Sequence, residues 1–342
     1  MKKFRLSCLA LAGIGLAALS FQSQACSRFT YTGQNNLVIT GRSMDWMSDV
    51  QTNLWALPAG LHRVGATGPH PLKWTSRYGS VVAAVYDMGT ADGMNTAGLD
   101  ANLLYLANTQ FPANKSGLPN LDVLNWVQYM LDNYATVDQA VKDFSKKKFN
   151  MLAPMLPGNH YPSVHLALTD KSGDNAIFEY VHGKLIIHHG KQYKVMTNEP
   201  DYDQQLALND YWQSLKGSFL PGTTRPEDRY VRASYYLGEA PQTNNTQMAL
   251  ATVFSIIRNV STPYGARASK DHPNIAPTLW VSVADLKDGV YYFQNTNRPN
   301  VFWVDLSKLD LKKGAPVKRL ALAGGEVYAG DASDQFVAAN SQ

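Results

Sequence analysis

Hydrophobic and polar residues alternate in short runs over much of the chain, a pattern typical of half-buried β-strands. The first run covers 28–32. The turn residues Asn35 and Asn36 then predict a return strand over 37–41, and therefore a hairpin. The same pattern predicts later strands at 80–87, 99–105, 163–169, 175–181, 184–189, 193–197, 278–284, 289–294 and 301–305.

Apolar positions recur at helical spacing in two other regions of the chain. The ranges predicted to be helical are 121–134, 137–146, 201–215, 227–238 and 246–258. A glycine-containing run over 93–98, between two strand patterns, predicts a turn. The resulting order of strands, helices, strands, helices and strands favours an α+β fold with layers around antiparallel sheets. The connecting loops are too short and too mixed in composition to be interdomain linkers.

The N-terminal segment follows a different pattern, that of a cleaved export signal. Three basic residues within the first five precede an apolar stretch over 6–19, which is too short to span a membrane comfortably. Small side chains then occupy the −3 and −1 positions of the run Ser-Gln-Ala at 23–25. We therefore expect a signal peptide over 1–25 and a mature chain over 26–342 in the periplasm of a Gram-negative bacterium.

Loss of this segment would change the charge balance of the protein. The whole chain of 342 residues has a formal net charge of +4, and removing 25 residues with three basic and no acidic side chains would leave +1 on 317 residues. A nearly neutral chain has no electrostatic footprint for nucleic acid. After the signal no apolar run reaches about 18 residues, so no stable membrane insertion is expected. The sequence has no HExxH, GxGxxG or P-loop pattern, and we expect neither a metal nor a cofactor.

Cleavage after Ala25 would make Cys26 the first residue of the mature chain. The other cysteine, Cys8, would leave with the signal, which excludes an internal disulfide. Three interpretations of Cys26 remain: the lipidated residue of a lipoprotein, an unpaired residue with no special role, or a nucleophile whose own α-amino group is its base. Lipoprotein signals usually have Leu at −3, where this chain has Ser23.

An N-terminal nucleophile needs a cation near the sulfur, a carboxylate near the amine and donors for an oxyanion. The sequence offers the first two together, because Arg42 and Asp45 follow the return strand of the predicted hairpin. If the two strands pair antiparallel, Arg42 comes back close to Cys26, and Asp45 lies just beyond. An Arg and an Asp three positions apart are more often a solvated pair, so it is the hairpin that favours the catalytic interpretation.

Five sequence features occur in a fixed order: Cys26 behind its signal, GRSMDW at 41–46, DGMNTAGL at 92–99, TNEP at 197–200 and EDRYVRA at 227–233. Each later motif is weak alone, and the ordered set is specific. Together they resemble the choloylglycine hydrolase family of N-terminal nucleophile hydrolases, which contains penicillin V acylases and conjugated bile salt hydrolases. The resemblance implies an amidase with a four-layer αββα fold, two stacked antiparallel sheets and a single catalytic domain.

The resemblance also implies roles for individual residues. Cys26 matches the family's nucleophile, and Arg42 and Asp45 match the charged residues beside it. Arg229 matches a second arginine of the site. Asn198 matches an asparagine whose amide faces the oxyanion, and Tyr105 matches the other oxyanion position. Bile salt hydrolases usually have Asn at that last position, and a tyrosine would leave its backbone N–H as the donor. From the residues alone, Asn198, Arg229 and Tyr105 would be interpreted as a turn residue, a helix brace and a core residue.

Trp46 directly follows Asp45 and is predicted to border the acyl pocket. Met47, Trp55 and Tyr105 are further candidates for an apolar wall around the acyl group, although aromatic residues in strands are more often core residues. Trp46 resembles the pattern of Gram-negative penicillin V acylase-like members. We therefore expect hydrolysis of penicillin V, of N-acyl homoserine lactones, or of both, through a thioester on Cys26. Burial of such an acyl group would contribute about 0.8 kcal/mol per CH₂. A conjugated bile salt hydrolase is one alternative, and a periplasmic lipoprotein binding module with a lipidated cysteine is another.

Assembly is the last expectation that the family raises. Its members suggest a homotetramer, but an insertion that supports the tetramer in Gram-positive members lies between the residues that match Asn198 and Arg229. This chain is shorter there, which weakens the expectation. Otherwise the expected partner is a small acyl amide substrate.

Overall fold

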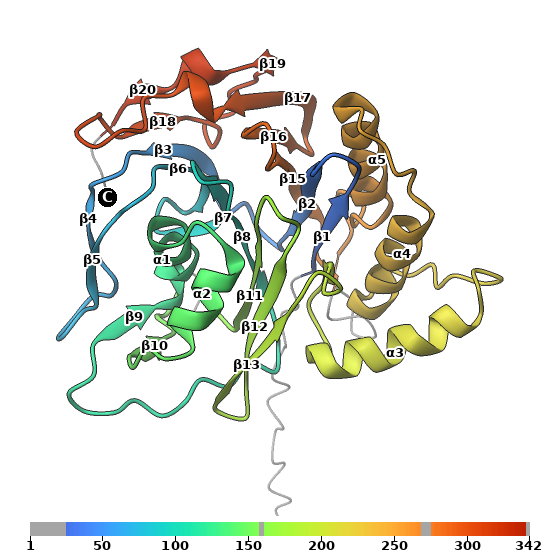
Figure 1. Ribbon diagram of the computed structural model, residues 1–342, viewed down its shortest axis with the longest axis horizontal. Helices are drawn as coiled ribbons and strands as arrows, with labels where there is room; N and C mark the ends of the chain where they lie inside the picture. Colours follow the sequence, from blue (N-terminus) through green and yellow to red (C-terminus); the bar gives the residue numbers. More distant parts are fainter. Residues whose placement is uncertain (1–24, 157–160, 268–274, 340–342) are drawn as a thin grey trace, which may run out of the picture.

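The structure, a computed structural model, describes residues 25–156, 161–267 and 275–339. All of the predicted signal peptide except Ala25 therefore lies outside the described residues. Within them, two large sheets stack face to face and helices cover both outer sides (Figure 1). This is the four-layer αββα arrangement expected from the sequence, and the predicted fold class is confirmed.

The first sheet has seven strands and contains the N-terminal hairpin. Its strands are, in spatial order, β14 (Val195–Met196), β1 (Cys26–Thr32), β2 (Val38–Asp45), β15 (Thr278–Asp285), β16 (Val290–Asn295), β17 (Arg298–Asp305) and β19 (Gly330–Asp331). All neighbours are antiparallel except β17 and β19, which are parallel. The predicted hairpin is thus confirmed, and both its strands are longer than the sequence pattern suggested.

The second sheet has nine strands. They are, in spatial order, β13 (Lys184–His189), β12 (Asn175–Val181), β11 (Val164–Thr169), β8 (Asp100–Tyr105), β7 (Gly89–Asn95), β6 (Ser80–Val85), β3 (Asn53–Leu57), β18 (Lys318–Leu320) and β20 (Val337–Ala338). Two small two-stranded sheets flank it, formed by β4 (His62–Val64) with β5 (Lys73–Thr75) and by β9 (Asn120–Asp122) with β10 (Asn150–Leu152).

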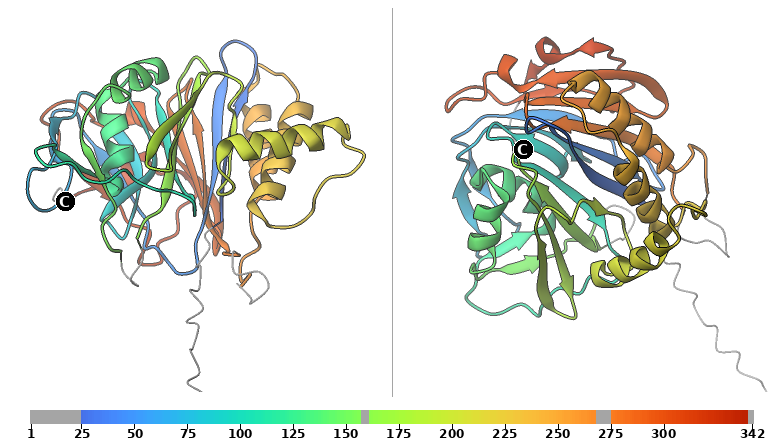
Figure 2. Two further views of the ribbon diagram at one scale, coloured as in Figure 1. Left: turned by 90° about the horizontal axis from the view of Figure 1, so that it is seen from below. Right: turned by 45° about the vertical axis from the view of Figure 1, so that its right-hand side comes forward.

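Five α-helices form the outer layers of the described chain (Figure 2). The second sheet is covered by α1 (Trp126–Asn133) and α2 (Val137–Phe144), and the first by α4 (Pro226–Glu239) and α5 (Thr246–Asn259), with α3 (Tyr202–Ser214) against α4. Short 3₁₀ turns are η1 (Val123–Asn125), η2 (Leu306–Lys308) and η3 (Ser333–Gln335). No described helix is long and apolar enough to cross a membrane.

Two hydrophobic clusters hold these layers together, and the central strands contribute to both. On β11 and β12, Leu166 and Phe178 pack in the cluster under α1 and α2, whereas Ala167 and Ile177 belong to the cluster shared with the first sheet. Successive side chains of a strand point to opposite faces, so apolar residues at every position bury both faces of the sheet. The site described below lies in the cluster shared with the first sheet, which includes Cys26.

The structure corrects two predicted boundaries. The run 93–98 is not all turn, because β7 continues to Asn95, whose side chain bonds the carbonyls of Leu131 and Tyr134. Gly93 is needed there for close approach, since a Cβ would lie 2.5 Å from the carbonyl oxygen of Val81. The helix predicted at 121 begins only at 126, after a short strand and a 3₁₀ turn.

Candidate active site

The hairpin brings the start of β1 beside the end of β2. Cys26 lies opposite Met44, and Arg28 lies opposite Arg42. Opposed residues of neighbouring strands point to the same face of a sheet, so Cys26, Met44 and Arg42 share the face that looks toward the second sheet. The opposite face carries Ser27, whose hydroxyl bonds a side chain of α4. The prediction that the hairpin returns Arg42 to the neighbourhood of Cys26 is confirmed.

Cys26 is almost fully buried, with 2% of its surface exposed. Its Sγ lies 4.0 Å from Met44 Sδ and 3.8 Å from the carbonyl oxygen of Asp45. Burial raises the pKa of the thiol, although the positive charge of Arg42 opposes this. With the peptide bond to Ala25 intact, desolvation therefore outweighs the nearby cation, and the sulfur is held as a thiol.

Arg42 is fixed between the two sheets by contacts on several sides. Its Nη2 lies 3.0 Å from Met44 Sδ and donates to the carbonyl oxygen of Leu103 at 3.1 Å. Its guanidinium stacks on the ring of Trp280, 4.3 Å from the centroid, and Nη1 lies 3.9 Å from a carboxylate oxygen of Asp92. These contacts hold a buried cation on the same face as the sulfur.

Asp45 is completely buried and is bonded mainly by hydroxyl groups. Its Oδ1 accepts from Thr278 Oγ1 at 2.6 Å and its Oδ2 from Thr262 Oγ1 at 3.5 Å. Nη1 of Arg229 lies 3.9 Å from Oδ2. Burial raises the pKa of this carboxyl from 3.8 to about 6, because Arg229 and the hydroxyl bonds offset only part of the desolvation.

This raised pKa predicts how stability depends on pH. Because the pKa of Asp45 is about 6 in the folded protein and 3.8 ordinarily, the folded state binds the proton more tightly. The associated stability is present below about pH 4 and is lost as pH rises to about 6, a change of roughly 3 kcal/mol. Asp45→Asn removes this titration. The free energy of unfolding of the variant should therefore rise relative to that of wild type by roughly 3 kcal/mol between pH 4 and pH 7. Urea unfolding of both proteins measures the difference, and parallel pH curves would contradict the assignment.

Arg229, on α4, joins the backbone and side chains of the site. Its Nη1 donates to the carbonyl oxygen of Cys26 and to Ser27 Oγ, each at 2.6 Å. Its Nη2 donates to Asn198 Oδ1 at 2.9 Å, and its Nε to the carbonyl oxygen of Thr224 at 2.9 Å. The side chain is fully buried, so these bonds and Asp45 together compensate a cation that has lost its water.

Asn198 connects the nitrogen of Cys26 with the second sheet. Its Oδ1 accepts a bond from the backbone N–H of Cys26 and its Nδ2 donates to the carbonyl oxygen of Tyr105 at 2.8 Å. In this uncleaved chain the nitrogen of Cys26 is the amide of the bond to Ala25; cleavage would leave an amine in its place. An amide Nδ2 carries two N–H groups, and the described bonds use one of them.

Tyr105 contributes its backbone groups to the site around Cys26 and Asn198. The N–H of Leu106 donates to the carbonyl oxygen of Ser163 on the side of β11. Neighbouring residues of a strand direct their backbone groups to opposite edges, so the N–H of Tyr105 lies on the same edge as its carbonyl, which accepts from Asn198. The tyrosine ring itself is half-buried, and burial raises the pKa of its hydroxyl.

The predicted acyl wall is brought together only in part. Trp46 is half-buried against the cluster that contains Cys26, and its backbone N–H donates to the carbonyl oxygen of Pro277 at 3.1 Å. Trp55 lies elsewhere: it packs in the other cluster, beside Val82, and its Nε1 donates to Asp87 at 2.8 Å. The structure therefore does not place Trp55 at the wall, because its strand turns this side chain toward the outer face of the second sheet.

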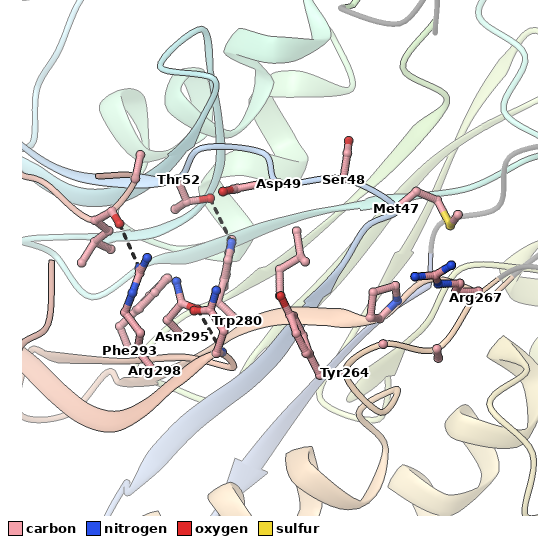
Figure 3. Close-up of a pocket in the computed structure, with 17 residues that line it drawn as sticks. Met47, Ser48, Asp49, Thr52, Tyr264, Arg267, Trp280, Phe293, Asn295 and Arg298 are labelled. Carbon is pink, nitrogen blue, oxygen red and sulfur yellow. Dashed lines mark hydrogen bonds between the residues drawn. The ribbon is translucent and has the colours of Figure 1, made fainter. Parts of the chain in front are cut away.

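Met47 lines a pocket of about 650 Å³ next to the site around Cys26 (Figure 3). Trp280 and Phe293 from the first sheet form part of its lining, and Tyr264 lies across from them. Met44 pairs with Cys26 on one side and with Trp280 on the other. Because neighbouring strands lie about 4.8 Å apart, the pocket wall at Trp280 lies roughly 10 Å from Cys26. Among the described residues, neither Cys26 nor Asn198 lines the pocket itself.

Several residues that support the site carried no usable signal in the sequence. Thr278 and Thr262 hold Asp45 and bond each other, and Trp280 supports Arg42. In a strand pattern, Trp280 looks like any core aromatic, and a threonine looks like a β-branched strand residue. Within the described ranges, no three His, Cys, Asp or Glu side chains converge as a metal site would require.

Comparisons with known proteins agree with this geometry. The family of linear amide C–N hydrolases described as the choloylglycine hydrolase family matches residues 26–319. A penicillin V acylase from Pectobacterium atrosepticum is 44% identical, with 98% of this chain and 96% of the relative covered. The structure of penicillin V acylase from Agrobacterium tumefaciens has 48% identity and a TM-score of 0.87, over 92% of this chain and 98% of that one.

A more distant solved structure shares the fold. A variant of conjugated bile acid hydrolase from Clostridium perfringens has a TM-score of 0.74 at 19% identity, over 86% of this chain and 97% of that one. The family match begins at Cys26, the residue at which the described first strand also begins. From its sequence, its fold and these relatives, the chain belongs to the choloylglycine hydrolase family of linear amide C–N hydrolases.

Proposed function

We propose that the protein hydrolyses the side-chain amide of penicillin V through Cys26 after its signal peptide is removed. The supporting observation is that the nitrogen of Cys26, Asn198 and Arg229 meet in one buried hydrogen-bond network. Cleavage after Ala25 would turn that nitrogen into an amine whose neighbours are already in position. A thiol and its base would then belong to the same residue.

The first half of the proposed reaction forms a thioester. The amine of Cys26 takes the thiol proton, and the thiolate attacks the amide carbon of the substrate. The carbonyl oxygen becomes an oxyanion, which the second N–H of Asn198 and the backbone N–H of Tyr105 stabilise. The ammonium group then returns the proton to the leaving nitrogen, the C–N bond breaks, and the acyl group stays on Sγ.

The second half releases the acid. The amine of Cys26 takes a proton from water, which attacks the thioester carbon through a second oxyanion. The C–S bond breaks, the carboxylic acid leaves, and the sulfur regains its proton. Asp45 and Arg229 keep opposite charges next to each other in the buried network, while Arg42 favours the thiolate that forms in each half.

Penicillin V is the preferred substrate class because the two most identical relatives named above are penicillin V acylases. N-Acyl homoserine lactones are the second candidate. The apolar pocket wall, which includes Leu279, Phe293 and Leu322, starts roughly 10 Å from Cys26, within reach of an extended acyl chain. A bile salt hydrolase is less favoured, because the relative of that kind shares only 19% identity.

The proposal includes export and assembly. A signal peptide over 1–25 would take the protein to the periplasm, where its removal frees the amine that the reaction needs. A lipidated Cys26 is the competing outcome and would block both sulfur and amine. A homotetramer remains a prediction from the family.

A substrate screen tests the proposed function. Protein with a verified N-terminal Cys26 is assayed on penicillin V, a long-chain N-acyl homoserine lactone and glycocholate. We expect a kcat/KM for penicillin V roughly 100-fold or more above that for glycocholate, since the acyl group must fit before the amide is cut. Fast turnover of glycocholate alone would contradict the substrate assignment, and a diacylglyceryl group on Cys26 would contradict the enzyme assignment.

A further inference from the structure

Asn198 lies in an irregular segment between β14 and α3, and such a segment needs anchors to hold one side chain in place. Two of them are hydrogen bonds to neighbouring parts of the chain. Thr197 Oγ1 donates to the carbonyl oxygen of Pro226 at 2.9 Å, and Tyr202 OH donates to that of Val195 at 2.9 Å. These bonds tie the segment to the helical layer and to its own strand, but not to the second sheet.

Glu179 supplies an anchor from the second sheet. It is on β12, its surface is 1% exposed, and its Oε2 accepts from the backbone N–H of Tyr202 at 3.0 Å. Tyr202 is the first residue of α3, and the preceding Asp201 makes no side-chain capping bond. The first N–H groups of a helix need acceptors, and a carboxylate there also matches the helix dipole. Glu179 therefore takes the place of the missing cap.

Glu179 is itself fixed. Leu166 pairs with Phe178, so one step along the two strands His165 stands opposite Glu179. Nδ1 of His165 lies 2.8 Å from Oε1 of Glu179, and each of the two side chains is 2% exposed. A carboxylate only accepts hydrogen bonds, so Nδ1 carries the proton of this bond. Both carboxylate oxygens of Glu179 thus have a partner, and neither partner belongs to the site described above.

We propose that Glu179 is a positioning residue for Asn198. This inference rests on the proposed function and goes beyond it, because it assigns a role to a residue that touches neither Cys26 nor substrate. The carboxylate fixes the start of α3, four residues after Asn198, and thereby the distance of the Asn198 amide from the oxyanion. Misplacement of such a group by about 1 Å can cost around 100-fold in rate.

The chain offers a matched control in Asp170. It follows β11, is 4% exposed, and its Oδ2 accepts from the N–H of Val137 at 2.9 Å. Val137 is the first residue of α2, which covers the outer face of the second sheet. Loss of Asp170 therefore removes the same kind of contact at a helix that does not adjoin the proposed site.

Three variants test the proposal: Glu179→Ala, Glu179→Gln and Asp170→Ala. We expect Glu179→Ala to lower kcat for penicillin V by roughly 10- to 100-fold with KM within about twofold of wild type, because an oxyanion donor acts mainly in the transition state. Glu179→Gln keeps an acceptor for Tyr202 and should retain most of kcat. Asp170→Ala should lower the thermal midpoint and leave kcat unchanged.

Hydrogen exchange provides a readout that does not depend on turnover. The backbone amides of 198–203, apart from Pro200, should exchange faster in Glu179→Ala than in wild type. Those of 137–140 should exchange faster in Asp170→Ala. Equal kcat in the two alanine variants at a temperature where both are folded, or unchanged exchange over 198–203, would overturn the proposal. A wild-type protein that cleaves no amide in the screen would instead contradict the proposed function, and the exchange data would still decide whether Glu179 fixes the segment.

Discussion

Replacement of Cys26 by alanine is expected to lower kcat for amide hydrolysis by roughly 10⁴-fold or more, the size of effect seen when a covalent nucleophile is removed. The substitution removes the sulfur that would carry the acyl group, and in the described structure this side chain makes only long contacts, at 4.0 Å and 3.8 Å. The fold should therefore tolerate the smaller side chain. The measurement is the steady-state rate on penicillin V, with the N-terminus of each protein verified.

The other cysteine of the chain is the matched control. Cys8 lies in the predicted signal, so Cys8→Ser should yield a mature protein with the same mass and the same kcat as wild type. If Cys26→Ala kept more than about a tenth of the wild-type rate, covalent catalysis by this residue would be refuted.

Replacement of Arg229 by leucine is expected to have the second largest effect. The guanidinium bonds the carbonyl of Cys26, the hydroxyl of Ser27 and the amide of Asn198, and lies 3.9 Å from Asp45. Its loss would leave a buried carboxylate without its cation, which costs about 3–5 kcal/mol in the free energy of unfolding. We expect kcat to fall as well, by roughly 10²–10³-fold, because the Asn198 amide would lose a partner.

A variant of Arg232 serves as the control that separates the loss of stability from the loss of kcat. It is on the same helix and 9% exposed, and its Nη1 donates to the carbonyl oxygens of Pro221 and Thr223. Arg232→Leu should therefore reduce stability in urea unfolding without a comparable loss of kcat. Similar kinetic losses in the two variants at a temperature where both are folded would show that Arg229 acts only through stability.

Much of the fold could be predicted because apolar residues recur in most helices and strands with the period of that structure. The helix α5 and the strands β1, β2 and β15 were predicted within a few residues. β3 was missed, because all five of its residues are buried and show no alternation. β18, β19 and β20 have only two or three residues each, and tertiary pairing rather than local pattern creates them.

Local sequence could predict some residues of the candidate site but not others. A local argument was enough for Arg42 and Asp45, because one hairpin returns them to Cys26. The contacts of Cys26 with Asn198 and Arg229 span 172 and 203 residues, so only the family resemblance could suggest them. Trp280 and Glu179 gave no signal, since a buried strand residue looks the same whether it supports a core or a site.

Mass spectrometry of the protein during turnover shows directly whether Cys26 is an N-terminal nucleophile that carries the acyl group. The purified protein is mixed with penicillin V, quenched in acid within the first turnovers, and its N-terminal peptide is sequenced. We expect a chain that begins at Cys26 with a free amine and carries a phenoxyacetyl group on Sγ, which hydroxylamine removes. A chain that retains Ala25, a lipidated Cys26, or an acyl group on another residue of an active protein would contradict this expectation.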